Sequence, residues 1–403
     1  MAGTLRNVVV VGGSFVGINT AKELANILPA THRVLLVEPH SHFHHLFAFP
    51  RFAISSGHEH KAFIPLSAVF ADSPGAPRHQ VVRARAVSLQ PHSLTLDREW
   101  QGSRTIPFDF LVVATGTRLA APGTMPDDDK PPSVRYLQAH QNGIRAAQSV
   151  VIVGGGAVGV QMACDLKELY PSKTITLVHS REQLMPVYHE ALSNLIKARF
   201  TELGVQLVTG SRAVVPPNGG GFPNHTGQQP FNVQLQDGRA LPADFAILAT
   251  GQIPNNQFLS GLREEEGEEE SLLINPRNGF VRVRPTLQFL DSRYPHLFAV
   301  GDIADTGAHK AAKPGMVQAA VAARNIAALL GGREPEERLS VAPAAIHLTL
   351  GLTRNVIFRN PNTAEGDTEP FINLKDDGRE DMGIDAVWVR RGVVVSSPQE
   401  YHL

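Results

Sequence analysis

Apolar runs that end in glycine-rich turns occur twice along the chain. Residues 7–11 (NVVVV) lead into GGSFVG, and residues 149–153 (SVVIV) lead into GGGAVG. A continuous apolar run is typical of a strand in a parallel sheet that is covered on both faces. Apolar positions at helical spacing follow each turn, over residues 17–28 and 158–169. The pattern therefore predicts two strand–turn–helix units of the same kind.

The two halves of the chain also match beyond these units. Second strands are predicted over residues 33–37 and 174–178, and short alternating strands over residues 81–110 predict a β-meander. Each half then closes on an apolar strand that ends in Ala-Thr-Gly, at residues 114–116 and 249–251. The sequence therefore predicts an α/β fold with two Rossmann-like dinucleotide-binding domains.

The order of these elements predicts the domain organisation. We expect the first domain to be discontinuous, over residues 1–122 and 248–332, with the second domain inserted at residues 123–247. A small α+β C-terminal domain is predicted over residues 333–403. Its strands are predicted at residues 345–350, 386–389 and 393–395. A glycine- and proline-rich loop at 216–230 and an acidic run at 264–270 are expected to be solvated.

Composition narrows the possible functions. The 403 residues carry a net charge of -1 and no lysine-rich run, so nucleic acid is not an expected partner. No apolar stretch approaches the roughly 20 residues of a membrane span, and no targeting signal precedes the first strand. We therefore expect a cytoplasmic protein with no integral membrane segment. Cys164 is the only cysteine, which excludes a redox pair of thiols, so a cofactor must handle any electrons.

The first glycine-rich turn has the residues that bind a dinucleotide. Gly12 permits the tight turn, Gly17 permits close helix–strand packing, and the N–H groups at the helix start bind phosphate. Ser14, which follows Gly13, replaces the usual second glycine of the motif and is small enough to let the backbone approach the pyrophosphate. Glu38 lies 21 residues after Gly17 (38 − 17 = 21). A carboxylate there accepts from ribose hydroxyls and repels a 2′-phosphate.

The second turn contains the complete motif, with Gly154, Gly156 and Gly159 at the three glycine positions. The acid that should end the next strand is missing, and His179 takes its place, with Arg181 close by. An arginine in this region accommodates the 2′-phosphate of NADPH. A surface arginine that never meets the ligand fits the sequence equally well. The choice between NADH and NADPH is therefore left open.

Together these motifs resemble the flavoprotein reductases with two dinucleotide domains, the pyridine nucleotide-disulfide oxidoreductase superfamily. The resemblance rests on GGSFVG with Glu38, the two Ala-Thr-Gly strand ends and Ala299-Val300-Gly301-Asp302, and it covers about residues 5–332. His42-Phe43-His44-His45 is similar to the apoptosis-inducing-factor-like and ferroptosis-suppressor-like branch, which is related to type II NADH dehydrogenases. Relatives that reduce disulfides carry a cysteine pair where this chain has residues 42–52, so a disulfide substrate is not expected.

The resemblance assigns FAD to the first site and NADH or NADPH to the second. It implies that Asp302 bonds the flavin ribitol chain, and that His44 or His45 lies near the isoalloxazine, where it bonds the flavin or relays a proton. Lys313 and Pro314 precede a helix predicted over residues 315–330, and a proline at the first helical position signals a helix start. The start of this helix and Lys313 would stabilise the reduced flavin.

The candidate residues form a catalytic set and a cofactor-binding set. No metal site is expected, because no residue spacing matches a zinc motif. The catalytic candidates are His44, His45 and Lys313. The cofactor-binding candidates are Gly12, Gly13, Ser14, Gly17, Glu38, Thr115, Gly116, Gly154, Gly156, Gly159, Arg181, Gly251, Gly301 and Asp302.

The resemblance implies an FAD-dependent oxidoreductase that passes hydride from NAD(P)H to FAD and then electrons to an acceptor, with a quinone as the leading acceptor. One alternative is a flavin-dependent oxidase or dehydrogenase of an organic metabolite in a biosynthetic pathway, with a degenerate second site. The missing acid and Gln161, where relatives often carry glutamate, point that way. Another is a redox-sensing binding protein of the apoptosis-inducing type. The expected partner is a small-molecule acceptor or substrate, and a homodimer is left open.

Overall fold

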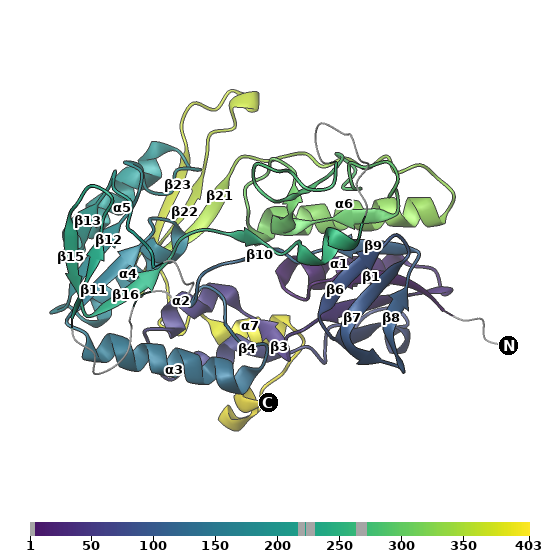
Figure 1. Cartoon of the computed structure of the whole chain (residues 1–403), viewed down its shortest axis with the longest axis horizontal. Helices are drawn as coiled ribbons and strands as arrows, with labels where there is room; N and C mark the ends of the chain where they lie inside the picture. The colour runs from purple at the N-terminus through teal and green to yellow at the C-terminus, as the bar shows by residue number, and fades with distance from the viewer. Residues whose placement is uncertain (1–4, 217–221, 223–229, 263–271) are drawn as a thin grey trace.

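The computed structural model describes residues 5–216, 222, 230–262 and 272–403. The predicted acidic run and most of the predicted glycine- and proline-rich loop lie outside these residues. Figure 1 shows two α/β units side by side, with the C-terminal strands against one unit and the C-terminal helix between the two.

The valine-rich first strand lies at the centre of a five-stranded parallel sheet, in the order β19–β9–β1–β2–β5. Its strands are β1 (Arg6–Val11), β2 (His32–Glu38), β5 (Gln80–Arg83), β9 (Phe110–Val113) and β19 (Leu297–Ala299). The meander predicted from residue 81 therefore begins later, because residues 80–83 pair in parallel with β2. Since β19 comes from a distant part of the sequence, this domain is built from two separate segments.

The two faces of this sheet are covered differently. Val8 packs with helix α1 (Phe15–Ile27), and helix α6 (Ala312–Leu330) lies beside α1 (Figure 1). Val9, which points the other way, packs with an antiparallel meander. The meander consists of β6 (Ala86–Gln90), β7 (Ser93–Trp100) and β8 (Ser103–Pro107). This coverage explains why the first strand is apolar at successive positions.

The second unit repeats this plan around a four-stranded parallel sheet in the order β13–β12–β11–β16. Its strands are β11 (Ser149–Val153), β12 (Thr174–Val178), β13 (Gln206–Val208) and β16 (Phe245–Leu248). One face packs with the helices α3 (Lys130–Ala146), α4 (Ala157–Leu169) and α5 (Glu190–Leu203). The other face packs with the hairpin of β14 (Phe231–Gln234) and β15 (Ala240–Ala243). The predicted α/β class with two Rossmann-like units is confirmed.

Two short strands join the units. β10 (Thr117–Arg118) pairs antiparallel with β17 (Ile253–Pro254), so the chain leaves and re-enters the first unit at adjacent points. The Thr115 hydroxyl donates to the Asn255 carbonyl at 2.7 Å, and the Asn255 side-chain amide donates to the Thr115 carbonyl at 2.9 Å. The second unit is therefore inserted into the first. The domain boundaries at residues 122 and 248 remain predictions.

The C-terminal region differs from its prediction in part. The strand β21 (Ala345–Thr349) forms where a strand was predicted, in an antiparallel sheet with β22 (Arg354–Arg359) and β23 (Phe371–Asp376). Residues 386–389 lie instead in a helix, α7 (Ile384–Arg390), and residues 393–395 form no strand. A helix forms instead of the predicted strand because Ile384, Val387 and Trp388 lie at helical spacing and are all buried on one face.

The remaining elements are short, and several lie between β2 and β5. They are β3 (His42–His44), α2 (Phe49–Phe52), β4 (Phe63–Pro65), β18 (Val281–Arg282), β20 (Ala304–Asp305), β22 (Arg354–Arg359), β23 (Phe371–Asp376) and the 3₁₀ segments η1 (Leu46–Ala48), η2 (Glu59–Ala62), η3 (Ala76–Arg78), η4 (Gln257–Gly261), η5 (Gly301–Ile303), η6 (Thr363–Glu365) and η7 (Pro398–His402).

A buried ion pair connects the two nucleotide-binding units and the C-terminal sheet. Arg51 of α2 donates from Nε to Asp165 of α4 at 2.6 Å, and both side chains are fully buried. The same guanidinium donates to the Gly351 carbonyl, in the turn between β21 and β22, at 2.9 Å. Because a buried cation needs such partners, this contact fixes the C-terminal sheet against both nucleotide-binding units.

Candidate active site

The first glycine turn connects β1 to α1, and its shape requires glycine. Gly12 has a φ of 107°, and a Cβ there would lie 2.5 Å from the Ala114 carbonyl oxygen. A Cβ on Gly17 would lie 1.7 Å from the Gly12 carbonyl oxygen. Ser14 is the N-cap of α1 but makes no side-chain capping hydrogen bond. The N–H groups of the first helical turn therefore remain available for a phosphate.

Glu38 ends β2 beside this turn. Its carboxylate is 5% exposed, and it accepts from the Gly13 N–H and from the backbone N–H of His40, the latter at 2.9 Å. The His40 ring also contacts this carboxylate through Nδ1. These contacts raise the pKa of His40 against the lowering effect of burial, which is the largest single influence. The carboxylate is thus held where the sequence predicts the FAD ribose.

Two further segments meet the first turn. Val16 touches both Gly301, which precedes Asp302, and Gly315 of α6: a Cβ on either glycine would lie within 3.2 Å of its side chain. Burial raises the pKa of Asp302, and the nearby Lys310 opposes this shift. The structure therefore brings the predicted Gly301–Asp302 pair to the first turn of α1.

The helix α6 begins at Ala312, earlier than predicted. Lys313 therefore lies inside its first turn and is exposed, and the following proline occupies the third helical position rather than the first. Proline is tolerated there because the first-turn N–H groups have no intrahelical partner. Thr115 and Gly116, the other predicted residues, follow β9, and Gly116 has a φ of 59°.

The two predicted histidines are buried. His44 is 6% exposed and His45 is 8% exposed, and among the described residues neither His44 Nε2 nor His45 Nδ1 has a hydrogen-bond partner. The His45 ring centroid is 5.8 Å from that of Phe15, the first residue of α1. Burial lowers the pKa of His45 to about 4, and the charges of Arg391 and Arg390 add to this effect. His45 is therefore a neutral imidazole at pH 7.

These features fit FAD. A cradle that admits only glycine, an open helix start, a fixed carboxylate and two unpartnered buried imidazole atoms surround one site. Within the described ranges, no cluster of three or more His, Cys, Asp or Glu side chains is arranged to hold a metal ion.

The second turn has the same backbone as the first. A Cβ on Gly154 would lie 2.3 Å from the Ala249 carbonyl oxygen, and one on Gly159 would lie 1.9 Å from the Gly154 carbonyl oxygen. Gly156 is the N-cap of α4, and Gly251 has a φ of 67° at the end of the closing strand. The predicted glycines of the second turn are thus brought together as in the first.

At this second turn His179 takes the place that Glu38 has at the first. The Gly155 N–H donates to His179 Nδ1 at 3.1 Å. Burial lowers the pKa of His179, as does the charge of Arg181 to a smaller extent, so the ring is neutral and Nδ1 is an acceptor. Arg181 itself is exposed.

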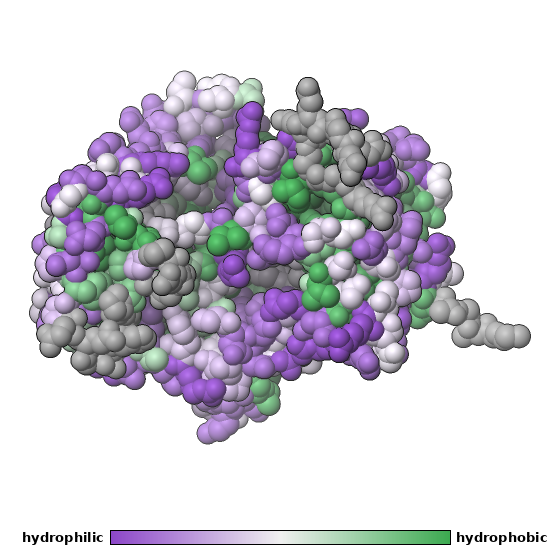
Figure 2. Space-filling model, viewed as in Figure 1, coloured by the Kyte–Doolittle hydropathy of each residue, from purple (hydrophilic) through white to green (hydrophobic). Residues whose placement is uncertain are grey.

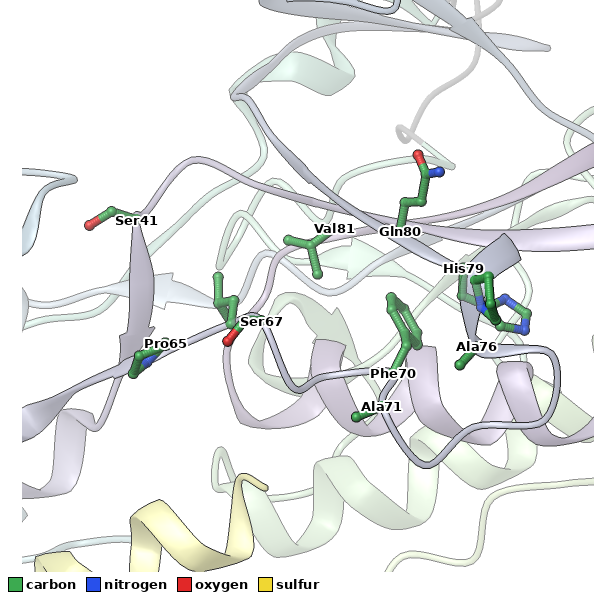
Figure 3. A pocket seen from close by; sticks show the side chains of 11 residues that line it. Ser41, Pro65, Ser67, Phe70, Ala71, Ala76, His79, Gln80 and Val81 are labelled. Carbon is green, nitrogen blue, oxygen red and sulfur yellow. The ribbon is translucent and has the colours of Figure 1, made fainter. Parts of the chain in front are cut away.

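A separate hollow of about 710 Å³ lies in the segment between β2 and β5, with α1 running beneath it in Figure 3. None of the predicted site residues lines it. Its lining residues are Ser41, Pro65, Leu66, Ser67, Phe70, Ala71, Ala76, Pro77, His79, Gln80 and Val81. The nucleotide sites are therefore defined by the glycine turns and not by this hollow.

Sequence reasoning missed Arg391. Its guanidinium carbon lies 3.9 Å from the centroid of the Phe43 ring and 5.2 Å from that of Phe15. In the sequence it belongs to an Arg-Arg-Gly turn with no motif around it. Only the fold brings it beside the first glycine turn.

Comparison with known proteins agrees with this site. Residues 6–325 match the family model described as pyridine nucleotide-disulphide oxidoreductase, and the chain belongs to that family. It is 32% identical to Fe-regulated protein 8 of Mycosarcoma maydis, over 96% of this chain and 95% of that protein. It is 29% identical to ferroptosis suppressor protein 1 of Mus musculus, over 87% of both proteins. The predicted family and branch are confirmed.

The solved structure of sulfide:quinone oxidoreductase from Aquifex aeolicus has the same fold, with a TM-score of 0.73 at 18% identity, over 98% of this chain and 94% of that chain. The protein is therefore an FAD-dependent NAD(P)H oxidoreductase, as predicted. Among the described helices, none is long and apolar enough to cross a membrane. On the face in Figure 2, hydrophobic patches are small and lie among hydrophilic residues.

Proposed function

We propose that this enzyme uses NAD(P)H to reduce a quinone by way of FAD. The carrying observation is an aromatic cluster at the start of α1, where Phe15 contacts Phe43 and Phe47 at ring-centroid distances of 4.9 and 4.7 Å. Phe47 is 52% exposed, so the cluster reaches the surface. Aromatic rings that surround a flavin site suit a flat apolar acceptor.

The absence of a suitable thiol supports the same acceptor class. Cys164 is fully buried in α4, and burial together with Asp165 raises the pKa of its thiol well above the usual value. A protonated buried thiol does not exchange with a disulfide. The solved relative with the same fold is named for a quinone acceptor, which agrees with this proposal.

FAD, when bound, would supply the two-electron chemistry that links the nicotinamide to the acceptor. The protein's own residues would bind and orient FAD. The first glycine turn and Glu38 would hold the diphosphate and ribose, and Asp302 would bond the ribitol chain. Lys313, which is exposed, and the start of α6 would add positive charge on the flavin side of the site. The neutral ring of His45, or that of His44, holds or relays a proton at its unpartnered nitrogen.

The metabolite-oxidase alternative is less well supported. It relies on a degenerate second site, yet the second turn repeats the glycine geometry of the first. Gln161 lies inside α4, where its amide donates to Met382 Sδ at 3.9 Å and its side chain also bonds the buried Asp165, which is a structural role.

Anaerobic stopped-flow absorbance tests the proposal. NADH or NADPH should bleach the flavin band near roughly 450 nm, and a short-chain ubiquinone should then restore it within the same mixing experiment. Oxidised glutathione serves as the control acceptor and should leave the flavin bleached. If the quinone restores the band no faster than glutathione does, the quinone assignment is wrong. If neither nucleotide bleaches the flavin, the second site does not deliver hydride.

A further inference from the structure

Arg391 is a cation that the C-terminal region places beside the first glycine turn. It directly follows α7, which lies beside β3 and β4 in Figure 1. Trp388 anchors this helix, because its indole N–H donates to the Lys61 carbonyl at 2.8 Å. The guanidinium thereby reaches over Phe43, at 3.9 Å from the ring centroid, and next to Phe15, at 5.2 Å.

This guanidinium has no polar partner in the described part of the chain. Its recorded contacts are the two aromatic rings, and no hydrogen bond or ion pair joins it to another described residue. Burial lowers the pKa of Arg391 to about 10, and the charge of Arg390 adds to this shift, so the group remains a cation at pH 7. Arg51, in contrast, is buried against a carboxylate and backbone carbonyls. A half-buried guanidinium that stacks on two rings and has no acceptor among the described residues leaves its N–H donors free for an anion.

The surroundings of Arg391 favour an anion as well. Phe15 is the first residue of α1, whose open N–H groups carry the positive end of the helix dipole. His45 is neutral, and its buried Nδ1 has no partner. The anion that this family binds at the first glycine turn is the diphosphate of FAD.

We propose that Arg391 binds the FAD diphosphate, so that the C-terminal segment closes the cofactor site over the start of α1. The guanidinium offers up to five N–H donors in a planar fork, which matches phosphate oxygens. The two phenylalanine rings hold it in place through cation–π contact. This proposal depends on FAD binding and not on which acceptor the enzyme reduces.

The test compares two neighbouring arginines in full-length apoprotein titrated with FAD, with flavin fluorescence as the readout. Arg391→Gln should raise the dissociation constant of FAD by about 10- to 100-fold, as expected for a lost charged hydrogen bond. Arg390→Gln removes the same charge from an exposed neighbour and should change the constant by less than about 2-fold. Arg391→Lys keeps the charge without the fork and should fall between the two. Equal FAD affinity in Arg391→Gln and the wild type would overturn the proposal.

Thermal denaturation separates binding from packing. In Arg391→Gln the apoprotein should melt close to the wild-type temperature, because the loss of the cation–π contacts is offset by the removal of a half-buried cation that has no acceptor among the described residues. The rise in melting temperature on adding FAD should shrink. A purely structural arginine gives the opposite result, with a lower apoprotein melting temperature and an unchanged FAD-dependent rise. Arg391→Met, which keeps the alkyl contact with the rings, provides the same comparison if the glutamine variant folds poorly.

Discussion

The glycine turns of the two nucleotide-binding units have the same backbone geometry but differ in one hydrogen-bond acceptor. In each, the second residue of the glycine turn donates its N–H to the side chain that ends the next strand: Gly13 to Glu38, and Gly155 to His179. A carboxylate has lone pairs left for ribose hydroxyls after this contact. A neutral imidazole has one acceptor nitrogen, and Gly155 already occupies it. We therefore expect the repeated backbone to fix where a dinucleotide binds, and the side chain that accepts this hydrogen bond to influence which dinucleotide it is.

The largest expected effect on nucleotide binding comes from adding a side chain to one glycine turn at a time. A Cβ on Gly17 or Gly159 would lie within 2 Å of a backbone carbonyl oxygen, at 1.7 and 1.9 Å respectively. Gly17→Ala should therefore weaken FAD binding by about 100-fold or more, since such overpacking costs roughly 3 kcal/mol. Gly159→Ala should retain FAD, but neither NADH nor NADPH should bleach it. Absorbance spectra of the purified variants check both outcomes. Loss of FAD from Gly159→Ala would show that the two sites are not independent.

A smaller effect on FAD binding is expected from replacing the two hydrogen-bond-accepting side chains, Glu38 and His179. Glu38→Gln should weaken FAD binding by about 10- to 100-fold, because hydrogen bonds to a charged group are lost. The matched change His179→Gln should alter FAD binding by less than about 2-fold, because His179 belongs to the other unit. Fluorescence titration of each apoprotein measures this difference. Similar losses in both variants would contradict the separate roles of the two acceptors.

Nucleotide choice should respond to the second acceptor. The wild type lacks a carboxylate that repels a 2′-phosphate, and Arg181 is exposed nearby, so we expect NADP⁺ to bind at least as tightly as NAD⁺. His179→Glu should reverse this preference by about 10-fold, and Arg181→Gln should weaken NADP⁺ alone by about 3- to 10-fold. Calorimetric titration of the FAD-loaded protein gives both constants. If Arg181→Gln weakens NAD⁺ and NADP⁺ equally, the arginine does not read the 2′-phosphate.

The smallest effect is a pH dependence of stability. His45 has a pKa of about 4 in the folded protein, below its ordinary value of 6.5. The unfolded chain therefore binds the proton first, and stability falls as pH drops from 6.5 towards 4. The loss should reach about 1 kcal/mol by pH 5.5. Denaturant unfolding of the apoprotein at pH 7.5 and pH 5.5 measures the total loss, to which His44, His60 and His140 also contribute because burial lowers their pKa values. The part of the loss that His45→Gln removes is the His45 contribution. His179→Gln should remove less of the loss, because His179 is only partly buried.

Local sequence pattern predicted the repeated strand–turn–helix units, because each residue involved acts on near neighbours. Gly12 and Gly17 meet the backbone of their own turn and of the adjacent strand, and Glu38 reaches the turn from the end of the next strand. The tail was harder to predict. Its valines suggested a strand at 386–389, but Trp388 is buried against residue 61, far away in sequence, and this packing favours the helix.

The sequence by itself determined the two glycine turns. It also determined the carboxylate of Glu38 beside the first turn and its replacement by His179 beside the second. These features depend on the spacing of residues along a strand and at a helix start, which covalent geometry sets. Only the tertiary structure decided the rest. It placed Arg391 over Phe43, joined Arg51 to Asp165, and buried His45 with its Nδ1 unpaired among the described residues. These contacts join residues far apart in the chain, and they form only when buried surfaces of separate domains pack together.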